Sequence, residues 1–186
     1  KTIYFQKNKV GLFKIENGNA ILVSDNKIFK QNILVNIFNY DDKLLVATED
    51  SGFFILDSKN LTTWNVPANQ LLSKENVYRS TRLKDKSFII GTRSNGILHM
   101  SREGVIEYQI STINGLSNNT IHYVYEDVER NIWLALNSGI NCVNIDSPLS
   151  VFNDEKGKIG TVNTSAVYNN NLYLGLRNPT GSRKEV

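Results

Sequence analysis

A glycine-marked pair of strands recurs along this chain at nearly constant spacing, and no other feature constrains the fold as much. Each copy has a short apolar strand, a small or polar loop, a glycine and a second strand, as in LLVATEDSGFFIL and FIIGTRSNGILHM. The glycines are Gly11, Gly52, Gly96, Gly139 and Gly181, so successive copies lie 41, 44, 43 and 42 residues apart. A fixed period of this length predicts similar units that stack on one another.

Two further segments complete each unit. An alternating segment precedes the apolar strand and is predicted to be the innermost strand, as in ILVNIFNYDD, VYRSTRLKD, TIHYVYEDVER and VNTSAVYNN. A segment with an aromatic residue follows the glycine strand in LTTWNV, VIEYQI and SPLSVF. Four antiparallel strands in about 40 to 45 residues are typical of a β-propeller blade. We therefore predict an all-β fold of four-stranded propeller blades, with almost no helix.

Stacking explains which residue types recur. A small twisted sheet cannot bury both of its faces alone, so neighbouring sheets must cover each other through alternate apolar side chains. The recurrent glycine is predicted to supply a positive φ, or a close backbone approach, between the second and third strands. Apolar residues stand at matching places in three units, namely Leu44, Val46, Phe88, Ile90, Ile132 and Leu134.

The repeat divides the chain into a partial blade at residues 1–32, blades at about 33–75, 76–118 and 119–160, and a partial blade at 161–186. That makes about four blades, whereas propellers close with four to eight. The segment is therefore either a small ring or, the interpretation that we favour, part of a larger one. An open arc exposes two sheet faces, which predicts other propeller blades or a second copy of the chain as partners.

Charge and cysteine usage narrow the function. The 21 basic and 18 acidic residues are spread along the whole sequence without a basic stripe, so nucleic acid is not an expected partner. Cys142 is the only cysteine, which excludes an internal disulfide and a zinc site built from several thiolates.

Membrane insertion and secretion signals are not expected within this sequence. Its apolar runs fall far short of the roughly 20 residues that span a bilayer. The opening KTIYFQ alternates as a strand does and does not resemble a signal peptide. We expect the sequence to be a piece of a longer protein.

The unit from Gly115 to Asp146 reads GLSNNTIHYVYEDVERNIWLALNSGINCVNID. It resembles the regulator-propeller repeat, which occurs in tandem in the periplasmic sensor region of hybrid two-component system proteins of gut Bacteroidetes. The shared features are GLSNN, the Glu-Asp before the turn, the Asn-x-Trp strand ending at Trp133, and Asn-Ser-Gly with its following apolar strand. The two preceding units match more loosely, with Leu45 and Ile89 in place of Trp133 and, in one of them, LLSKEN in place of GLSNN.

The resemblance implies a seven-bladed propeller in the periplasm, within a sensor anchored in the inner membrane. It implies a non-enzymatic segment that responds to an oligosaccharide, with a histidine kinase elsewhere in the full-length protein. The sequence itself shows neither a helical phosphoacceptor region nor a glycine-rich ATP lid. Two alternatives stay open: a protein–protein interaction scaffold without a small ligand, and a propeller lyase or hydrolase.

Catalytic chemistry has few candidate residues. A nucleophile would need a histidine beside it, and only His99 and His122 exist, both within strand patterns that favour a satisfied or solvent-facing side chain. Cys142 lies among apolar neighbours and is predicted to be a buried, inert thiol. We expect no catalytic residue.

Acidic residues recur just before the second strand of successive units, at Asp41 and Asp42, at Asp85, and at Glu126 and Asp127. Paired carboxylates suit acid/base chemistry or calcium. At a hairpin turn, however, such residues usually accept hydrogen bonds from backbone amides, and this is the interpretation we favour. No metal or cofactor is expected.

Propeller topology predicts where a ligand binds. Loops between the second and third strands and the connections between blades open on one face, around the central channel. Hydroxyl-rich ligands need dense donors and acceptors, and Arg93 with Arg177 is suited to pair a carboxylate or sulfate in bidentate geometry. The candidate ligand-binding residues are Arg93, Asn95, Asn137, Ser138, Arg177, Asn178, Asn76 and Asn119, flanked by Glu49, Asp50, Ser117 and Asn118.

Overall fold

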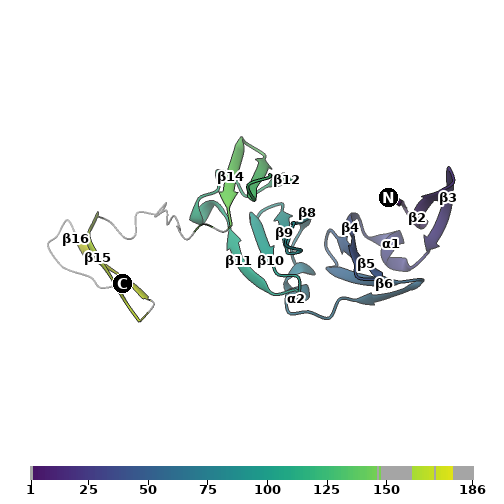
Figure 1. Ribbon diagram of the computed structural model, residues 1–186, viewed down its shortest axis with the longest axis horizontal. Helices are drawn as coiled ribbons and strands as arrows, with labels where there is room; N and C mark the ends of the chain where they lie inside the picture. The colour runs from purple at the N-terminus through teal and green to yellow at the C-terminus, as the bar shows by residue number, and fades with distance from the viewer. Residues whose placement is uncertain (1, 146, 148–160, 170, 178–186) are drawn as a thin grey trace. The chain divides into compact units, whose positions relative to one another are not determined.

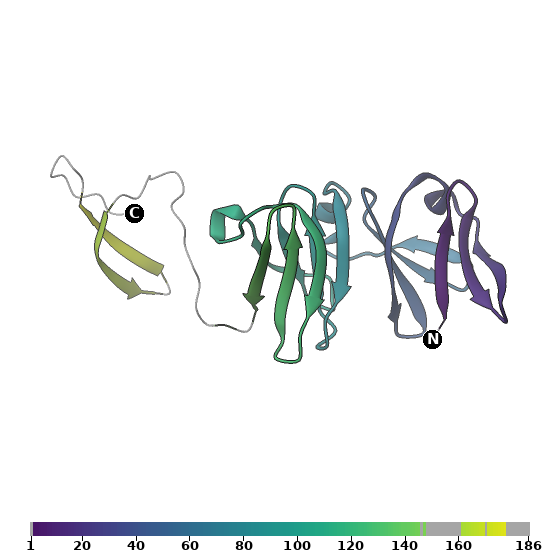
Figure 2. The same cartoon turned by 90° about the horizontal axis from the view of Figure 1, so that it is seen from above.

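The chain folds into a series of small antiparallel sheets with very little helix (Figures 1 and 2). The computed structural model describes the chain except residues 1, 146, 148–160, 170 and 178–186. It divides into two compact units, Lys1–Ser150 and Val151–Val186, which are treated separately below. The predicted all-β class is thereby confirmed.

The first unit holds four sheets, and within each of them the strands are hydrogen-bonded in chain order. The first sheet contains β1 (Ile3–Lys7), β2 (Gly11–Glu16) and β3 (Asn19–Ser24). The second contains β4 (Leu34–Tyr40), β5 (Lys43–Thr48), β6 (Phe53–Asp57) and β7 (Asn60–Thr63). The third contains β8 (Val77–Arg82), β9 (Phe88–Thr92), β10 (Ile97–Met100) and β11 (Ile106–Ile110), and the fourth contains β12 (Ile121–Glu126), β13 (Asn131–Leu136) and β14 (Ile140–Asn144).

The second unit contains an antiparallel hairpin of β15 (Thr161–Tyr168) and β16 (Asn171–Arg177). The four sheets and this hairpin fall one by one within the five segments that the repeat marks out, but the division into blades and their number stay predictions. Of the segment SPLSVF, in which a strand is predicted, only Ser147 is described, and Gly181 lies outside the described residues.

Short helical turns, which the sequence pattern did not predict, lead into β4, β8 and β12, the strands that are predicted to be innermost. They are α1 (Lys27–Gln31) before β4, α2 (Asn69–Leu72) before β8 and the 3₁₀ turn η1 (Thr112–Asn114) before β12. The side chain of Asn26 caps α1 by accepting the Ile28 N–H at 3.0 Å. Phe29 and Leu72 are buried to 1% and 0% exposure, so α1 and α2 add apolar side chains to the core between sheets.

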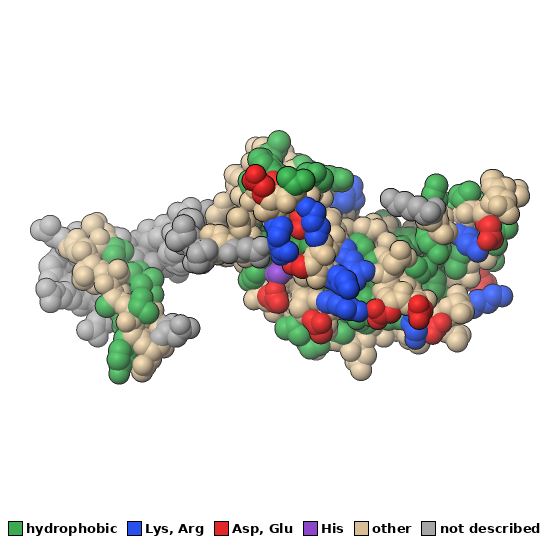
Figure 3. All heavy atoms as spheres, viewed as in Figure 1, with side chains coloured by type: hydrophobic (Ala, Val, Ile, Leu, Met, Phe, Trp, Pro, Cys, Tyr) green, Lys and Arg blue, Asp and Glu red, His purple; other side chains and the backbone are tan. Residues whose placement is uncertain are grey.

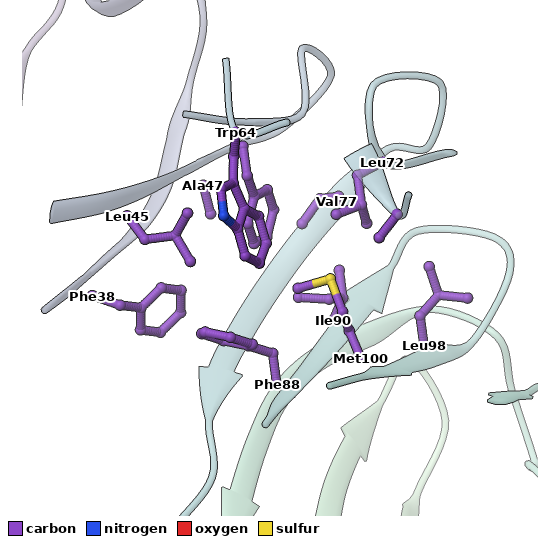
Figure 4. Packing of buried hydrophobic residues seen from close by; sticks show 12 residues of the cluster. Phe38, Leu45, Ala47, Trp64, Leu72, Val77, Phe88, Ile90, Leu98 and Met100 are labelled. Carbon is purple, nitrogen blue, oxygen red and sulfur yellow. The ribbon is translucent and has the colours of Figure 1, made fainter. Parts of the chain in front are cut away.

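Alternate apolar side chains hold neighbouring sheets together, as the repeat predicts. Leu44 and Val46 pack toward the first sheet, whereas Leu45 and Ala47 pack toward the third, so both faces of β5 are covered. In the core between the second and third sheets, Trp64 lies with its ring stacked on Phe53 and edge-on to Phe88 (Figure 4). The matching positions Ile132 and Leu134 pack toward the third sheet.

Polar bonds between neighbouring innermost strands end mostly on backbone carbonyls. The Asn36 amide donates to the Ser80 carbonyl at 2.8 Å, and the Arg79 Nε donates to the His122 carbonyl at 2.8 Å. The Arg82 Nη1 donates in the same way to the Asn39 carbonyl. These bonds fix the inner edges of three sheets side by side.

The outward face of the fourth sheet is exposed and rich in aromatic residues, and apolar side chains gather over this sheet in Figure 3. Trp133 is 43% exposed, although Leu45 and Ile89, which hold the same place in the second and third sheets, are 0% exposed. Cys142 pairs with Trp133 across the strands and is exposed as well. The prediction of a buried thiol was therefore wrong, because within the described part of the first unit no further sheet covers this face.

Two of the recurrent acidic residues, Asp85 and Asp127, hold the turns between the first two strands of their sheets. Asp85 accepts the Ser87 N–H at 2.9 Å, and Asp127 accepts the Glu129 N–H at 2.9 Å, which are the expected Asx-type bonds. Acidic and basic side chains neighbour one another over the face drawn in Figure 3, and Asp85 also pairs with Arg130 at 2.7 Å. The described residues contain no cluster of three or more His, Cys, Asp or Glu side chains suited to a metal ion.

The marker glycines close the turns between the second and third strands. Thr92 at the end of β9 donates through its backbone N–H and its hydroxyl to the Gly96 carbonyl, both at 2.9 Å. Gly96 has φ +73°, and a Cβ there would lie 2.1 Å from the Ile110 carbonyl oxygen. Gly139 has a similar φ of +85° but open space around it.

Gly96→Ala and Gly139→Ala should therefore differ in their effect on stability. Both place a side chain at positive φ, which costs roughly 1–2 kcal/mol. Only Gly96→Ala adds a backbone clash, and we expect it to lower the free energy of unfolding by at least about 1 kcal/mol more than Gly139→Ala. Urea unfolding curves of the two variants measure this difference, and equal losses would contradict it.

The Asp85 turn predicts a pH dependence of stability. Burial raises the pKa of Asp85, but hydrogen bonds from Ser87 and the Arg130 guanidinium outweigh burial and hold the pKa below its ordinary value. A carboxyl whose pKa is lower in the folded chain stabilises fully above its unfolded pKa of about 3.9, and this contribution is lost as the pH falls through the folded pKa.

Asp85→Asn should consequently reduce the midpoint of urea unfolding at neutral pH, and the difference from the parent should shrink below about pH 4. The exposed Asp42→Asn variant is the control and should track the parent at each pH. A difference for Asp85→Asn that stays constant with pH would argue against this role of the carboxylate.

Candidate functional site

The loop face, the edge of the stacked sheets at which β5, β9 and β13 end, brings equivalent residues of three sheets together. The residues directly after these strands are Glu49, Arg93 and Asn137. The Glu49 carbonyl accepts the Val77 N–H of the third sheet at 2.7 Å, and the Arg93 carbonyl accepts the hydroxyl of Thr120 at 2.7 Å. Hydrogen bonds between sheets therefore hold the loop face in position, in addition to the apolar packing below it.

Five side chains form a continuous cluster across this face, which we call the loop-face cluster: Glu49, Tyr78, Arg93, His122 and Asn137. Arg93 donates from Nε at 3.0 Å and from Nη2 at 2.6 Å to Oε1 of Glu49, and its guanidinium lies 4.2 Å from the Tyr78 ring centroid. The Tyr78 ring meets His122 edge-on at 5.6 Å, and His122 Nε2 lies 3.4 Å from Oδ1 of Asn137.

The partners of Arg93 bear on the chemistry that the cluster supports. Glu49 is mostly buried and Arg93 about half exposed, so the chain's own carboxylate already occupies the Nε–Nη2 edge of the guanidinium. A bidentate carboxylate or sulfate ligand would have to displace Glu49. The geometry therefore favours a neutral ligand that uses the remaining donors and the aromatic surface.

Exposed amide and hydroxyl side chains lie on the loop face, both within the cluster and beside it. Asn76, Asn137 and Ser138 are exposed, and Asn76 lies in the connection that enters β8. Their side chains carry both hydrogen-bond donors and acceptors at the surface of this face. Of the predicted ligand-binding residues, Arg93, Asn137, Ser138 and Asn76 are thus brought together.

Two other residues predicted to bind a ligand, Asn95 and Asn119, use their side chains in hydrogen bonds within the loops. Asn95 donates through Nδ2 to Glu75 at 2.7 Å, and Asn119 accepts the Thr112 N–H at 2.8 Å. These bonds shape the loops from which the exposed residues project. Arg177 ends β16, but its side chain and Asn178 lie outside the described residues.

Tyr78 and His122 are members of the cluster that the predicted ligand-binding set lacks. Both stand second in an innermost strand, one residue after a buried residue, Val77 or Ile121. That equivalence between two units is a signal the sequence contains. The stacking of Arg93 on Tyr78 depends on the distance between sheets, which the sequence pattern does not give.

His99 has a structural environment away from the loop face. It is 7% exposed, with Nε2 3.0 Å from the Ser87 hydroxyl and Nδ1 2.8 Å from the Glu107 carboxylate. This agrees with the expectation that His99 is satisfied or solvent-facing, and the structure shows the satisfied alternative. No helix among the described residues has the length and apolar composition needed to cross a lipid bilayer.

Comparison with known proteins gives structural likeness only. No protein-family model matches the chain, and no curated protein matches it in sequence. A structure described as the extracellular domain of the hybrid two component system BT3049 of Bacteroides thetaiotaomicron is similar, with a TM-score of 0.64 and 17% identity over 94% of this chain. A structure described as the extracellular domain of the one component system BT4673 of the same organism has a TM-score of 0.58 and 20% identity over 100% of this chain.

The chain spans 25% and 29% of the lengths of these two neighbours. At such low identity the likeness establishes a shared all-β fold of antiparallel sheets. The chain is thus similar in fold to extracellular domains of bacterial signalling systems.

Proposed function

We propose that this chain is a non-enzymatic part of a periplasmic sensor propeller, in a hybrid two-component signalling protein, and that its loop face binds a neutral oligosaccharide. The observation that carries the proposal is the loop-face cluster, because it joins aromatic, charged and amide side chains from three successive sheets. The fold likeness to extracellular domains of two-component systems supports the cellular role.

The chemistry of the loop face suits sugars. Hydroxyl groups both donate and accept, and the exposed side chains of Asn76, Asn137 and Ser138 do the same. Tyr78 adds an aromatic surface next to these amides, and sites for small molecules combine apolar surface with a few such polar groups in this way.

Signalling requires that the ligand favour one of two arrangements of the protein. The loop-face cluster spans residues 44 positions apart in sequence, Glu49 and Arg93, which belong to different sheets. A ligand that contacts several sheets at once changes the energy of their relative placement. We propose that this change is passed to a membrane-anchored histidine kinase in the full-length protein.

The same proposal includes a larger ring. Its support is the exposed outward face of the fourth sheet and the fact that the chain covers about a quarter of its structural neighbours. A seven-bladed propeller would supply further sheets to cover such faces.

Calorimetric titration with oligosaccharides tests the ligand proposal. The panel consists of neutral tetrasaccharides of glucose, xylose, mannose and galactose, together with one sulfated tetrasaccharide. We expect a neutral member to bind, and Asn137→Ala to weaken that binding about tenfold because hydrogen-bonding groups of the sugar lose their partner.

Asn60→Ala is the matched control, since Asn60 begins β7 at the opposite edge of the sheets, and it should bind like the parent. If none of the oligosaccharides binds, or if both variants bind like the parent, the loop face is not the sugar site.

A scaffold without a small ligand is the second candidate, favoured by the exposed face of the fourth sheet. Tyr123, Tyr125 and Ile140 on this sheet are 61%, 55% and 69% exposed. Exposed apolar patches of this kind mark protein interaction sites. The occupant would be another antiparallel sheet, from further blades or from a second copy of the chain.

Sedimentation velocity distinguishes this candidate. If the face is an interaction surface, the chain should self-associate as its concentration rises, and Ile140→Glu should shift it toward the monomer because a buried charge is costly. Val105→Glu, at an exposed apolar residue beyond β10, should leave association unchanged. A monomer at every concentration would count against the scaffold.

A further inference from the structure

A groove of about 570 Å³ lies beside the second sheet, where β7 leads into the helical turn α2. Among the described residues that line it, none carries a charge. Ser51, Asn65, Gln70 and Ser73 contribute hydroxyl and amide groups to the lining, and Pro67 contributes apolar surface. Asn65 and Gln70 are exposed, so their side chains are accessible from solvent.

The walls of this groove are held by hydrogen bonds that fix the connection between β7 and β8. The side chain of Asn69 accepts the Phe53 N–H at 2.6 Å and donates to the Phe53 carbonyl at 3.0 Å, which ties α2 to β6. The Ala68 N–H donates to the Gly104 carbonyl at 2.9 Å, and a Cβ at Gly104 would lie 2.5 Å from Val66. The turn between β10 and β11 therefore supports the same connection. Because these walls are already ordered, a ligand does not have to order them.

The groove adjoins the loop-face cluster. Ser51 follows Glu49 of the cluster by two residues, which span at most about 7 Å even when the chain is fully extended. Ser73 precedes the exposed loop-face residue Asn76 by three residues, a span of at most about 11 Å. The groove therefore continues the loop face toward β7, the outer edge strand of the second sheet.

The lining favours a neutral ligand whose groups both donate and accept hydrogen bonds. The amides of Asn65 and Gln70 each offer donors and an acceptor, as the hydroxyl groups of a sugar require. A charged ligand would lose hydration in the groove without gaining an opposite charge from the lining residues. The volume of the groove lies within the range of roughly 300–1,000 Å³ for small-molecule sites.

We infer that this groove is the outer part of the sugar site, so that a neutral oligosaccharide runs from the loop-face cluster into the groove. The inference rests on the proposed function, because it takes the loop face as the place where the first sugar units bind. It adds that the ligand is a chain of more than two sugar units and that Asn65 and Gln70 contact its far units.

Calorimetric titration with sugars of two lengths tests this inference. The ligands are neutral disaccharides and tetrasaccharides of glucose, xylose, mannose and galactose. For the sugar that binds, we expect the tetrasaccharide to bind at least about tenfold more tightly than the disaccharide, because only the longer chain reaches the groove. Asn65→Ala and Gln70→Ala should each weaken the tetrasaccharide by about fivefold to tenfold and leave the disaccharide unchanged, since hydroxyl groups of the far units lose a partner.

Asn60→Ala is the matched control for Asn65→Ala. Asn60 is an exposed asparagine at the other end of β7, and it is not among the residues that line the groove. This variant should bind both sugar lengths like the parent. Asn137→Ala, which alters the loop-face cluster itself, should weaken the disaccharide and the tetrasaccharide alike. Equal midpoints of urea unfolding for Asn65→Ala and the parent show that the variant is folded.

The outcomes separate the inference from the proposed function. If the tetrasaccharide binds no more tightly than the disaccharide, or if Asn65→Ala and Gln70→Ala both bind it like the parent, the groove is not part of the site. The loop-face proposal stands in that case. If no disaccharide and no tetrasaccharide binds, the loop-face proposal and the inference are both overturned.

Discussion

Mutual coverage of sheet faces is the interaction on which the rest of this structure depends. Each sheet of the first unit is thin and twisted, and its strands place successive side chains on opposite faces. Val46 and Leu45 therefore serve two different cores, one on each side of the second sheet. Since burial stabilises by about 25 cal/mol per Å² of apolar surface, the stack is held by many such alternations rather than by its loops. The loops are free to carry polar groups.

The functional proposals follow from this arrangement. Stacked sheets align equivalent loops, so residues one repeat apart, such as Glu49 and Arg93, become direct neighbours.

How far the sequence predicts this structure can be judged from particular residues. The spacing of Gly52, Gly96 and Gly139 located the strands, because a turn that needs positive φ leaves a visible mark. Turn-capping by Asp85 and Asp127 was equally readable, since an Asx bond is local. The exposure of Cys142 could not be predicted from the sequence, because burial depends on whether a neighbouring sheet lies on that face. The pairing of Arg93 with Glu49 depends on the distance between sheets, which no residue pattern encodes.

The hydrogen bonds between neighbouring innermost strands have a consequence for how the sequences of such repeats diverge. Side chains such as Asn36 and Arg79 reach the main-chain oxygens of Ser80 and His122, and every residue type offers the same oxygen. A mutation in one unit can therefore change an acceptor residue without deleting the bond that its neighbour makes. Each copy is therefore free to change its acceptor residues while these bonds between copies are kept.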